Sequence, residues 1–286
     1  MNLFNLIPLA LAYIMFVLGL QLRTKDFATI RTQPRALVVG LMSQMLMVPI
    51  TAFVLVQLFN LSPEMKFGIM LLSFCAGGAT SNLLSFYAGG NLALSVSLTA
   101  ISSLLSMITL PFFASITFTY FLGSEVPSFN PTKLSFAMFV LSTAPVLVGM
   151  VIRHYFERFV ERFSTAMQRL VNILFALLVI AAVAGNFDVM VEQFKGIGAL
   201  VLIMAAFLLV SGSFYARFSG MDRATQKTIA IETSLQNGAM GIALAPFIMP
   251  AVDGGLSVIA VPSAVYGVLM NAVILPYVWW CRRRMP

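Results

Sequence analysis

One acidic residue, Glu232, stands inside a long apolar stretch, and its position makes it a candidate for ion chemistry. The other acids fall in segments that read as loops, whereas Glu232 lies within QKTIAIETSLQNGAMGIALAPFIMP. A carboxylate at membrane depth costs several kcal/mol unless it is paired or coordinated. We therefore take Glu232 as a predicted ion-binding group. The alternative is a protonated carboxyl that hydrogen-bonds to neighbouring helices.

Polar, glycine-bearing interruptions occur halfway along two otherwise apolar segments, near 75–82 and near 232–238. They contain Gly77, Gly78, Thr80, Ser81, Asn82, Glu232, Thr233, Ser234, Gln236, Asn237 and Gly238. Where a helix unwinds, its carbonyl groups can coordinate a cation, and the N–H groups of the next half-helix attract an anion. Small residues also permit close helix packing, but packing does not require Asn, Gln or Glu. The sequence thus predicts two discontinuous helices.

Hydroxyl side chains follow the first interruption at helical spacing, at Ser95, Thr99, Ser102 and Ser106. This spacing places them on one face of a helix. Ser102 and Ser106 could equally bond back to their own helix. Ser95 and Thr99 form an oxygen-only set with Glu232, which suits a hard cation, and a single carboxylate favours a monovalent ion over calcium. Gln44, a lone polar residue within another apolar run, could be a hydrogen-bonding link between helices.

The elements that must position these residues are membrane helices. The chain has 286 residues, of which 60% are hydrophobic and 9% charged, and its mean hydropathy is +0.96. Because a span needs about 20 apolar residues, the apolar runs predict nine transmembrane helices of an all-α polytopic membrane protein. The predicted spans are 4–22, 36–59, 66–88, 91–121, 133–152, 168–186, 196–216, 227–249 and 257–280. No Lys or Arg precedes the first run, so we expect a span there and not a cleavable signal peptide.

The charges alternate between successive predicted loops. Lys and Arg gather at 23–35, 153–169, 217–227 and 282–284, whereas the intervening connections carry mainly acids. Because Lys and Arg accumulate on the cytoplasmic side, we expect a multi-pass protein of the cell (inner) membrane, with its N-terminus outside and its C-terminus in the cytoplasm. The net charge of +7 then reflects topology and not nucleic-acid binding. The 153–169 segment could also contact anionic lipid.

The two interrupted spans are the third and the eighth. Because this offset is odd, a duplication that relates them would place its copies in opposite orientations, as inverted-topology repeats. Spans one to four would then match spans six to nine, and the fifth would have no partner. The similarity between the halves is limited to Ser81 and Asn82 against Gln236 and Asn237.

Several other chemistries lack the residues they need. Cys75 and Cys281 are far apart in sequence, and His154 is the single histidine, so neither a disulfide framework nor a zinc site is expected. The sequence has no HExxH motif and no pair of acids within a span. We therefore expect no enzymatic activity, no redox cofactor and no metal other than sodium.

With these residues in view, the chain resembles the bile-acid:sodium symporter family over most of its length. The matching stretches are LGLQLRTKDF (18–27), SQMLMVPITAF (43–53), CAGGATSN (75–82), GGNLALSVSLTAISSL (89–104), TQKTIAIETSLQN (225–237) and AVPSAVYGVLMN (260–271). The resemblance implies that the two broken helices cross. It implies a panel domain of 1–31 and 132–186 and a core domain of 36–122 and 195–281. It also implies that the chain lacks the first helix of ten-helix relatives.

The resemblance further implies two sodium sites and a substrate site. The first sodium site would consist of Ser81, Asn82, Ser95, Thr99 and Glu232. The second would consist of Gln44, Glu232, Gln236 and the main-chain carbonyls of Thr233 and Leu235. The substrate would contact Ala79, Thr80, Asn82 and Asn237. The chain departs from the family pattern at Ala76, where relatives have proline, and in the order of Ala79 and Thr80.

The predicted function is therefore secondary active transport. We expect a monomer in the lipid bilayer that couples two sodium ions to the symport of an organic anion by alternating access. The resemblance allows bile-acid-like anions, steroid sulfates and small carboxylates such as pantoate or pyruvate. The main alternative is a sodium/proton antiporter with a similar crossed-helix core, which would usually need a further buried acid or a lysine. A passive channel is a third possibility.

Overall fold

The computed structural model describes residues 6–23, 29–75, 77–123, 131–184, 187–250 and 257–283, which are helical with no strand among them. The helices are α1 (Leu6–Gln21), α2 (Thr29–Thr32), α3 (Pro34–Met42), α4 (Val48–Leu58), α5 (Pro63–Phe74), α6 (Ala79–Tyr87), α7 (Leu92–Leu122), α8 (Pro131–Met138), α9 (Ala144–Tyr155), α10 (Glu157–Ala184), α11 (Phe187–Phe218), α12 (Arg223–Ser234), α13 (Gly238–Ile248) and α14 (Val261–Arg283). Two π-helical segments, η3 (Ser43–Met47) and η4 (Phe139–Thr143), and a 3₁₀ turn, η5 (Val258–Ala260), join some of them.

Several of these helices can cross a membrane by length and composition. Five do so alone, namely Pro34–Leu58, Ser135–Tyr155, Glu157–Ala181, Gly196–Phe218 and Val258–Arg283. A sixth is α7, if its halves Leu92–Ser106 and Ile108–Leu122, inclined at 55°, form one span. The bend precedes Pro111, which has no N–H for the helical hydrogen bond. The all-α polytopic fold is confirmed, and the number of nine spans stays a prediction.

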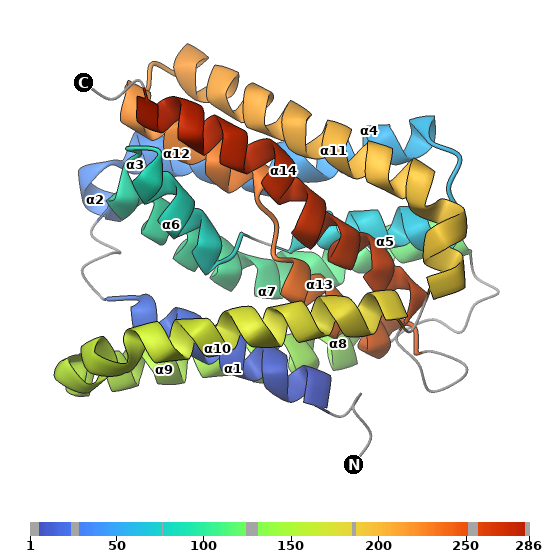
Figure 1. The fold of residues 1–286 in the computed structure, drawn as a ribbon, viewed down its shortest axis with the longest axis horizontal. Coiled ribbons are helices and arrows are strands. Elements are labelled where there is room, and N and C mark those ends of the chain that lie inside the picture. The colour runs from blue at the N-terminus through green and yellow to red at the C-terminus, as the bar shows by residue number, and fades with distance from the viewer. Residues whose placement is uncertain are drawn as a thin grey trace.

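The helices form two groups (Figure 1). In the lower part of the view, α1, α9 and α10 lie together, and above them lie α3, α4, α11, α12 and α14, with α5, α6, α7 and α13 between. The helices α1, α9 and α10 come from the segments predicted to form the panel domain. We call these three helices the panel layer, while the division into two domains remains a prediction.

Two glycines allow α1 and α9 to touch through their backbones. A Cβ built on Gly149 of α9 would lie 2.7 Å from the nitrogen of Leu20 and 2.9 Å from the carbonyl carbon of Gly19 in α1. Contacts of this kind between small residues are typical of helix pairs in membranes. The backbone of α1 cannot give way as a flexible side chain would.

We expect Gly149→Ala to destabilise the purified protein by about 1–3 kcal/mol, the usual cost of overpacking. The unfolding midpoint in detergent should fall by roughly 2–10 °C. Gly198→Ala is the matched control, because its Cβ would meet only side-chain atoms of Leu269 and Phe194, at 3.8 and 4.0 Å. Equal midpoints for the two variants would contradict the close α1–α9 contact.

Both predicted interruptions occur, but they are shorter than the predicted ranges. The first separates α5 from α6, with Cys75 and Gly78 in extended conformation. The second separates α12 from α13, with Leu235 extended and Asn237 capping α13. Asn82 and Glu232 therefore lie within helices next to the breaks, and Ala76 lies outside the described residues. The half-helices are too short to cross a membrane singly.

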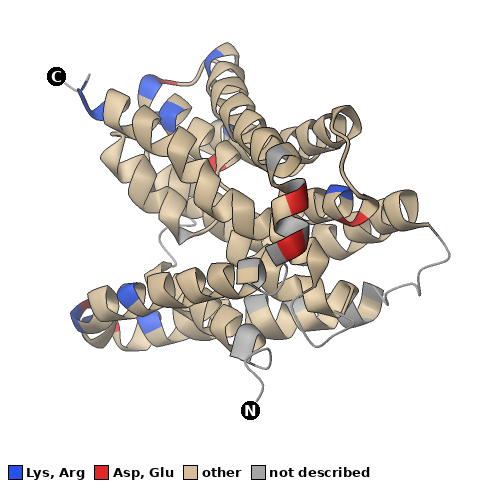
Figure 2. Cartoon of the chain, turned by 45° about the vertical axis from the view of Figure 1, so that its right-hand side comes forward, with Lys and Arg blue, Asp and Glu red and all other residues tan. Residues whose placement is uncertain are grey.

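The charged residues are distributed unevenly along the helices. Figure 2 shows most of the Lys and Arg ribbon at the end of the molecule that carries the C-terminus. Along α11, for example, Asp188 lies in the first turn and Arg217 in the last. At the same basic end, Arg23 and Arg153 each bridge Glu157 and Glu161, over 3.0–3.6 Å. The orientation in the membrane remains a prediction.

Candidate functional site

The carboxylate of Glu232 is fully buried and accepts hydrogen bonds from two other elements of the fold, η3 and α7. Its Oε1 accepts from the hydroxyls of Ser95 and, at 3.4 Å, Thr99, both on α7. Its Oε2 accepts from Nε2 of Gln44 at 3.0 Å and from Thr99 at 3.3 Å. Residues far apart in sequence thus meet at the last turn of α12.

Ser81 and Asn82 of α6 complete this cluster. Oδ1 of Asn82 accepts from Ser95 at 2.9 Å and from Thr99 at 3.3 Å. The hydroxyl of Ser81 lies 3.3 Å from that of Thr99 and donates to the carbonyl of Gly78 at 2.8 Å. All five residues of the predicted first sodium site therefore lie together, and none is more than 9% exposed.

The hydroxyls of Ser95 and Thr99 face more hydrogen-bond acceptors than they have hydrogens. A hydroxyl carries one hydrogen, yet Ser95 faces both Oδ1 of Asn82 and Oε1 of Glu232. The hydroxyl of Thr99 likewise faces Oδ1 of Asn82 and both oxygens of Glu232. Lone pairs directed at one point without enough hydrogens are what an oxygen-liganded cation requires. A cation would also offset the cost of burying the carboxylate.

Three of the five residues of the predicted second sodium site, Gln44, Glu232 and Leu235, meet on the other side of Glu232's carboxylate. Nε2 of Gln44 donates to the main-chain carbonyl of Glu232 at 3.2 Å as well as to Oε2. A Cβ built on Gly77 would lie 3.2 Å from the carbonyl oxygen of Leu235 and 3.7 Å from Nε2 of Gln44. The carbonyl of Thr233 accepts from Nε2 of Gln236 at 3.0 Å. Gln44, Glu232 and Leu235 thus surround one small space. The amide of Gln236 instead donates to the carbonyl three residues earlier in the sequence.

Gln44 presents one oxygen that has no hydrogen-bond partner among the described residues. Its Oε1 is buried and unpaired, while its Nε2 donates twice to Glu232. The amide nitrogen thus takes the place that a cation would take between these acceptors. Rotation of the amide by 180° would present Oε1 to that cation, and the two orientations are nearly equivalent in shape.

A π-helical turn positions Gln44. Within η3 the N–H of Val48 bonds to the carbonyl of Ser43, and Pro49 follows. Short π-helical segments are frequent at functional sites, and this one widens the helix where Gln44 faces α12. The hydroxyls of Ser43 and Thr233, 2.7 Å apart, tie the same two helices together. No sequence pattern indicates this second link, because Ser and Thr are common in membrane helices.

The turn between α6 and α7 is fixed to its neighbours by Asn91. Its main-chain N–H donates to the hydroxyl of Thr228 at 2.8 Å, and its Nδ2 donates to Gln33 at 2.7 Å. Its Oδ1 accepts from the N–H of Leu94 at 3.1 Å and so caps α7. These bonds hold the first turn of α7 against α12, so that Ser95 reaches Glu232.

Ser102 and Ser106, the remaining members of the hydroxyl stripe, bond to their own helix. Their hydroxyls donate to the carbonyls of Thr99 at 3.4 Å and of Ser103 at 2.8 Å. Both side chains are buried, but neither joins the cluster around Glu232. For Ser102 and Ser106, the structure therefore shows the alternative in which the hydroxyl bonds back to its own helix.

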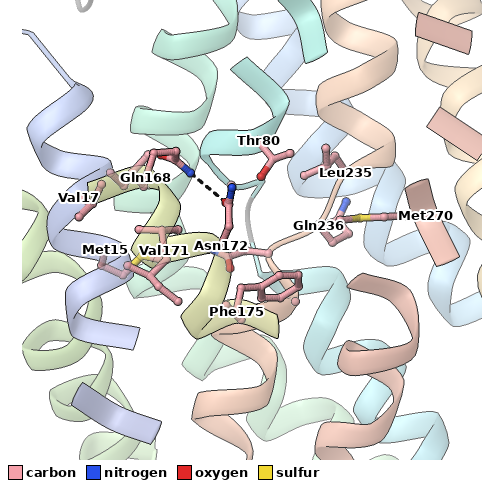
Figure 3. Close-up of a pocket in the computed structure, with 16 residues that line it drawn as sticks. Met15, Val17, Thr80, Gln168, Val171, Asn172, Phe175, Leu235, Gln236 and Met270 are labelled. Carbon is pink, nitrogen blue, oxygen red and sulfur yellow. Dashed lines mark hydrogen bonds between the residues drawn. The ribbon is translucent and has the colours of Figure 1, made fainter. Parts of the chain in front are cut away.

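A cleft separates the two breaks from the panel layer (Figure 3). It lies between α1 and α10 on one side and Gly78, Thr80 and residues 235–239 on the other, and its volume is about 80 Å³. Thr80 and Asn237, both predicted to contact substrate, line the cleft. Asn82 does not line it and points to Ser95 and Thr99 instead, and the side chain of Ala79 is not described.

The N-termini of α6 and α13 end at this cleft. The first N–H groups of a helix have no partner within it and carry a partial positive charge, and the side chain of Asn237 pairs only one of them, that of Met240 at 3.1 Å. The two breaks meet next to this point, where the N–H of Asn237 donates to the carbonyl of Cys75 at 3.4 Å. None of the described lining residues is Lys or Arg. The polar groups of the cleft therefore suit an anion bound by neutral donors.

Two lining residues of α10, Gln168 and Asn172, were not predicted as site residues. The predicted sixth span began at 168, so Gln168 was placed at the membrane edge. In the structure α10 begins at Glu157, because its charged first turns continue the helix. Two amides spaced i, i+4 were the signal available in the sequence.

Crossed half-helices, a buried oxygen cluster and an adjacent cleft are features of a membrane transporter. The chain belongs to the sodium bile acid symporter family, whose model matches residues 8–193. This family of sodium-dependent transporters is the one that the sequence resembled, so that prediction is confirmed. The membrane location follows from the family and from the apolar helices.

Individual relatives cover most of the chain. It is 30% identical over 265 residues to the uncharacterized sodium-dependent transporter YocS of Bacillus subtilis (strain 168), covering 93% of this chain and 79% of YocS. It is 29% identical over 292 residues to the probable sodium/metabolite cotransporter BASS2, chloroplastic, of Oryza sativa subsp. japonica, covering 99% of this chain and 65% of that protein. It is 25% identical over 236 residues to the ileal sodium/bile acid cotransporter of Oryctolagus cuniculus, covering 82% of this chain and 67% of the relative.

Proposed function

We propose that the protein is a secondary active transporter that uses a sodium gradient to carry an organic anion across the cell membrane. The observation that supports this most is that residues of the second break border both the cleft and the proposed ion-binding space beside Glu232. Leu235 and Gln236 line the cleft, and the carbonyl of Leu235 also faces the space beside Gln44 and Glu232. Cation binding would order these residues and so complete the anion site.

In this proposal two sodium ions share Glu232. The first is bound by Ser81, Asn82, Ser95, Thr99 and Glu232. The second is bound by Gln44, Glu232, the carbonyls of Thr233 and Leu235, and Gln236 after its amide turns. One carboxylate that contacts both ions makes their binding cooperative, because each ion orients the group for the other.

The organic anion binds at the N-termini of α6 and α13, close to Thr80 and Asn237. The core then moves against the panel layer, which opens the cleft to one side of the membrane at a time. The protein works as a monomer, with its N-terminus outside and its basic end in the cytoplasm. The substrate leaves chemically unchanged. Relatives named for metabolites and for bile acid leave the substrate class open between small carboxylates and steroid-like anions.

The test is uptake into proteoliposomes with an inward sodium gradient and a panel of labelled organic anions. We expect accumulation above the external concentration, which collapses when potassium replaces sodium. A passive channel would only equilibrate the anion, and a sodium/proton antiporter would change the internal pH without any anion. Either of those results would contradict the proposal.

A further inference from the structure

A second pocket lies within the panel layer, at the basic end of the molecule. Its walls come from the end of α1 and Arg23 after it, from Arg153 of α9, and from the first turns of α10. Its volume of about 360 Å³ falls within the range of ligand pockets. None of its described lining residues belongs to either break, so this pocket is separate from the site beside Glu232.

Two arginines and two glutamates form a ring of ion pairs at this pocket. Nη2 of Arg23 and Nη2 of Arg153 each lie 3.0–3.6 Å from Oε1 of Glu157 and Oε1 of Glu161. The side chains of the two glutamates are 55% and 54% exposed. Since a carboxylate can accept several hydrogen bonds, both glutamates can still accept a donor from outside the ring.

Arg153 is buried and has a donor without a partner. Its side chain lines the pocket and the residue is 9% exposed, and its Nε has no hydrogen-bond partner among the described residues. A buried donor of a charged group that stays unpaired costs free energy. Because guanidinium N–H groups bind phosphate oxygens in pairs, a phosphate group in the pocket would satisfy Arg153.

The pocket is not uniformly basic. Glu161 lines it together with Arg23 and Arg153, so a ligand with negative charge alone would also face a carboxylate. A zwitterion matches both signs. Its phosphate would pair with Arg153, and a primary ammonium group, which carries three N–H donors, would pair with Glu161.

The surface around the pocket has the composition of a membrane–water interface. The guanidinium of Arg162 lies 5.8 Å from the ring centre of Phe163, and Figure 2 shows Lys and Arg at this end of the panel layer. Exposed aromatic residues of the same segment are Tyr155, Phe156, Phe159 and Phe163. Aromatic side chains gather at the level of the lipid headgroups, and the pocket also has buried apolar lining at Leu20 and Val160.

We propose that this pocket binds the headgroup of an ethanolamine phospholipid, with the phosphate on Arg153 and the ammonium on Glu161. The lipid source follows from the interfacial surface around the pocket, and the ethanolamine group follows from the mixed charge of its lining. The bound headgroup joins α1, α9 and α10 at their basic ends. The inference does not depend on the proposed transport function.

The test is lipid binding to the purified full-length protein in detergent micelles. Phosphatidylethanolamine is compared with phosphatidylcholine and phosphatidylglycerol that carry the same acyl chains, with bound lipid counted by native mass spectrometry. We expect one ethanolamine lipid to bind about tenfold more tightly than either of the others, because choline has no N–H and glycerol has no positive charge. Equal binding of the three lipids would overturn the inference.

Soluble phosphoethanolamine separates a lipid from a free zwitterion. It carries both charges of the headgroup but has no acyl chains. We expect the ethanolamine lipid to raise the unfolding midpoint and phosphoethanolamine at the same concentration to leave it unchanged. Binding of phosphoethanolamine as tight as that of the lipid would show that the occupant is a soluble molecule, which contradicts the proposal.

Two variants test the pocket itself. Ser164→Trp changes an exposed lining residue and removes no ion pair, and it should block binding of the ethanolamine lipid. Thr165→Trp, at the next exposed position and outside the lining, is the matched control and should bind as wild type does. Equal binding by these two tryptophan variants would place the lipid elsewhere.

Glu161→Gln tests the ammonium contact. It removes the carboxylate that faces the pocket and leaves Arg153 in place, so the preference for ethanolamine over choline should disappear. Glu192→Gln, which changes an exposed acid of α11, should keep that preference. A preference that persists in Glu161→Gln would contradict the proposed orientation of the headgroup.

Discussion

Glu232→Gln is expected to abolish sodium-driven anion uptake in proteoliposomes. The carboxylate is the only charged group in the cluster, which otherwise consists of hydroxyl, amide and carbonyl groups. Removing one partner of a buried charge pair costs about 3–5 kcal/mol, which corresponds to a loss of sodium affinity of at least about 100-fold. The substitution keeps the size of the side chain, so the loss would not arise from packing.

The same variant should remain folded. Without sodium, the wild-type protein buries an uncompensated carboxylate, and Gln removes that charge, so the variant should be at least as stable as wild type in sodium-free buffer. Glu192→Gln, which changes an exposed acid of α11, should leave uptake intact. Sodium-dependent uptake by Glu232→Gln would show that the cluster is not the coupling site.

Gln44→Leu is expected to remove the second sodium site and leave the first. In the proposed second site the turned amide offers its Oε1, which has no hydrogen-bond partner among the described residues, to the ion, and bonds between a polar group and a charge contribute about 1.5–3 kcal/mol. The sodium concentration for half-maximal uptake should rise by roughly 10- to 100-fold. The Hill coefficient for sodium should fall toward one, because only one ion would then drive uptake.

Gln57→Leu provides the comparison for this substitution. Gln57 is on the same run of helix, is exposed, and contacts the hydroxyl of Tyr120 at 3.5 Å. We expect its sodium dependence to match wild type. If Gln44→Leu leaves both the half-maximal concentration and the Hill coefficient unchanged, the amide has no part in binding an ion.

The buried polar residues could be predicted from the sequence because lipid makes each of them costly. Glu232 falls in no predicted loop, and helix packing does not require the Asn and Gln residues of the two breaks. The structure brings Glu232, Asn82 and Ser95 within hydrogen-bond distance. Which ion they hold stays a prediction.

Other features depend on contacts that no sequence pattern records. The bond between Ser43 and Thr233 joins two residues that each look like ordinary helix residues. Gln168 and Asn172 became visible only when α10 proved to begin at Glu157. Asn82 was assigned to both an ion and the substrate, and its orientation toward Ser95 and Thr99 depends on which face of α6 meets α7. Residue spacing alone cannot determine that face.

Direct binding of radioactive ²²Na⁺ to the purified protein tests the central claim most closely. In buffer of constant ionic strength, we predict saturable binding to wild type that unlabelled sodium displaces and potassium does not, and we predict its loss in Glu232→Gln but not in Glu192→Gln. Binding that is absent from wild type, or that persists in Glu232→Gln, would contradict sodium coordination at Glu232.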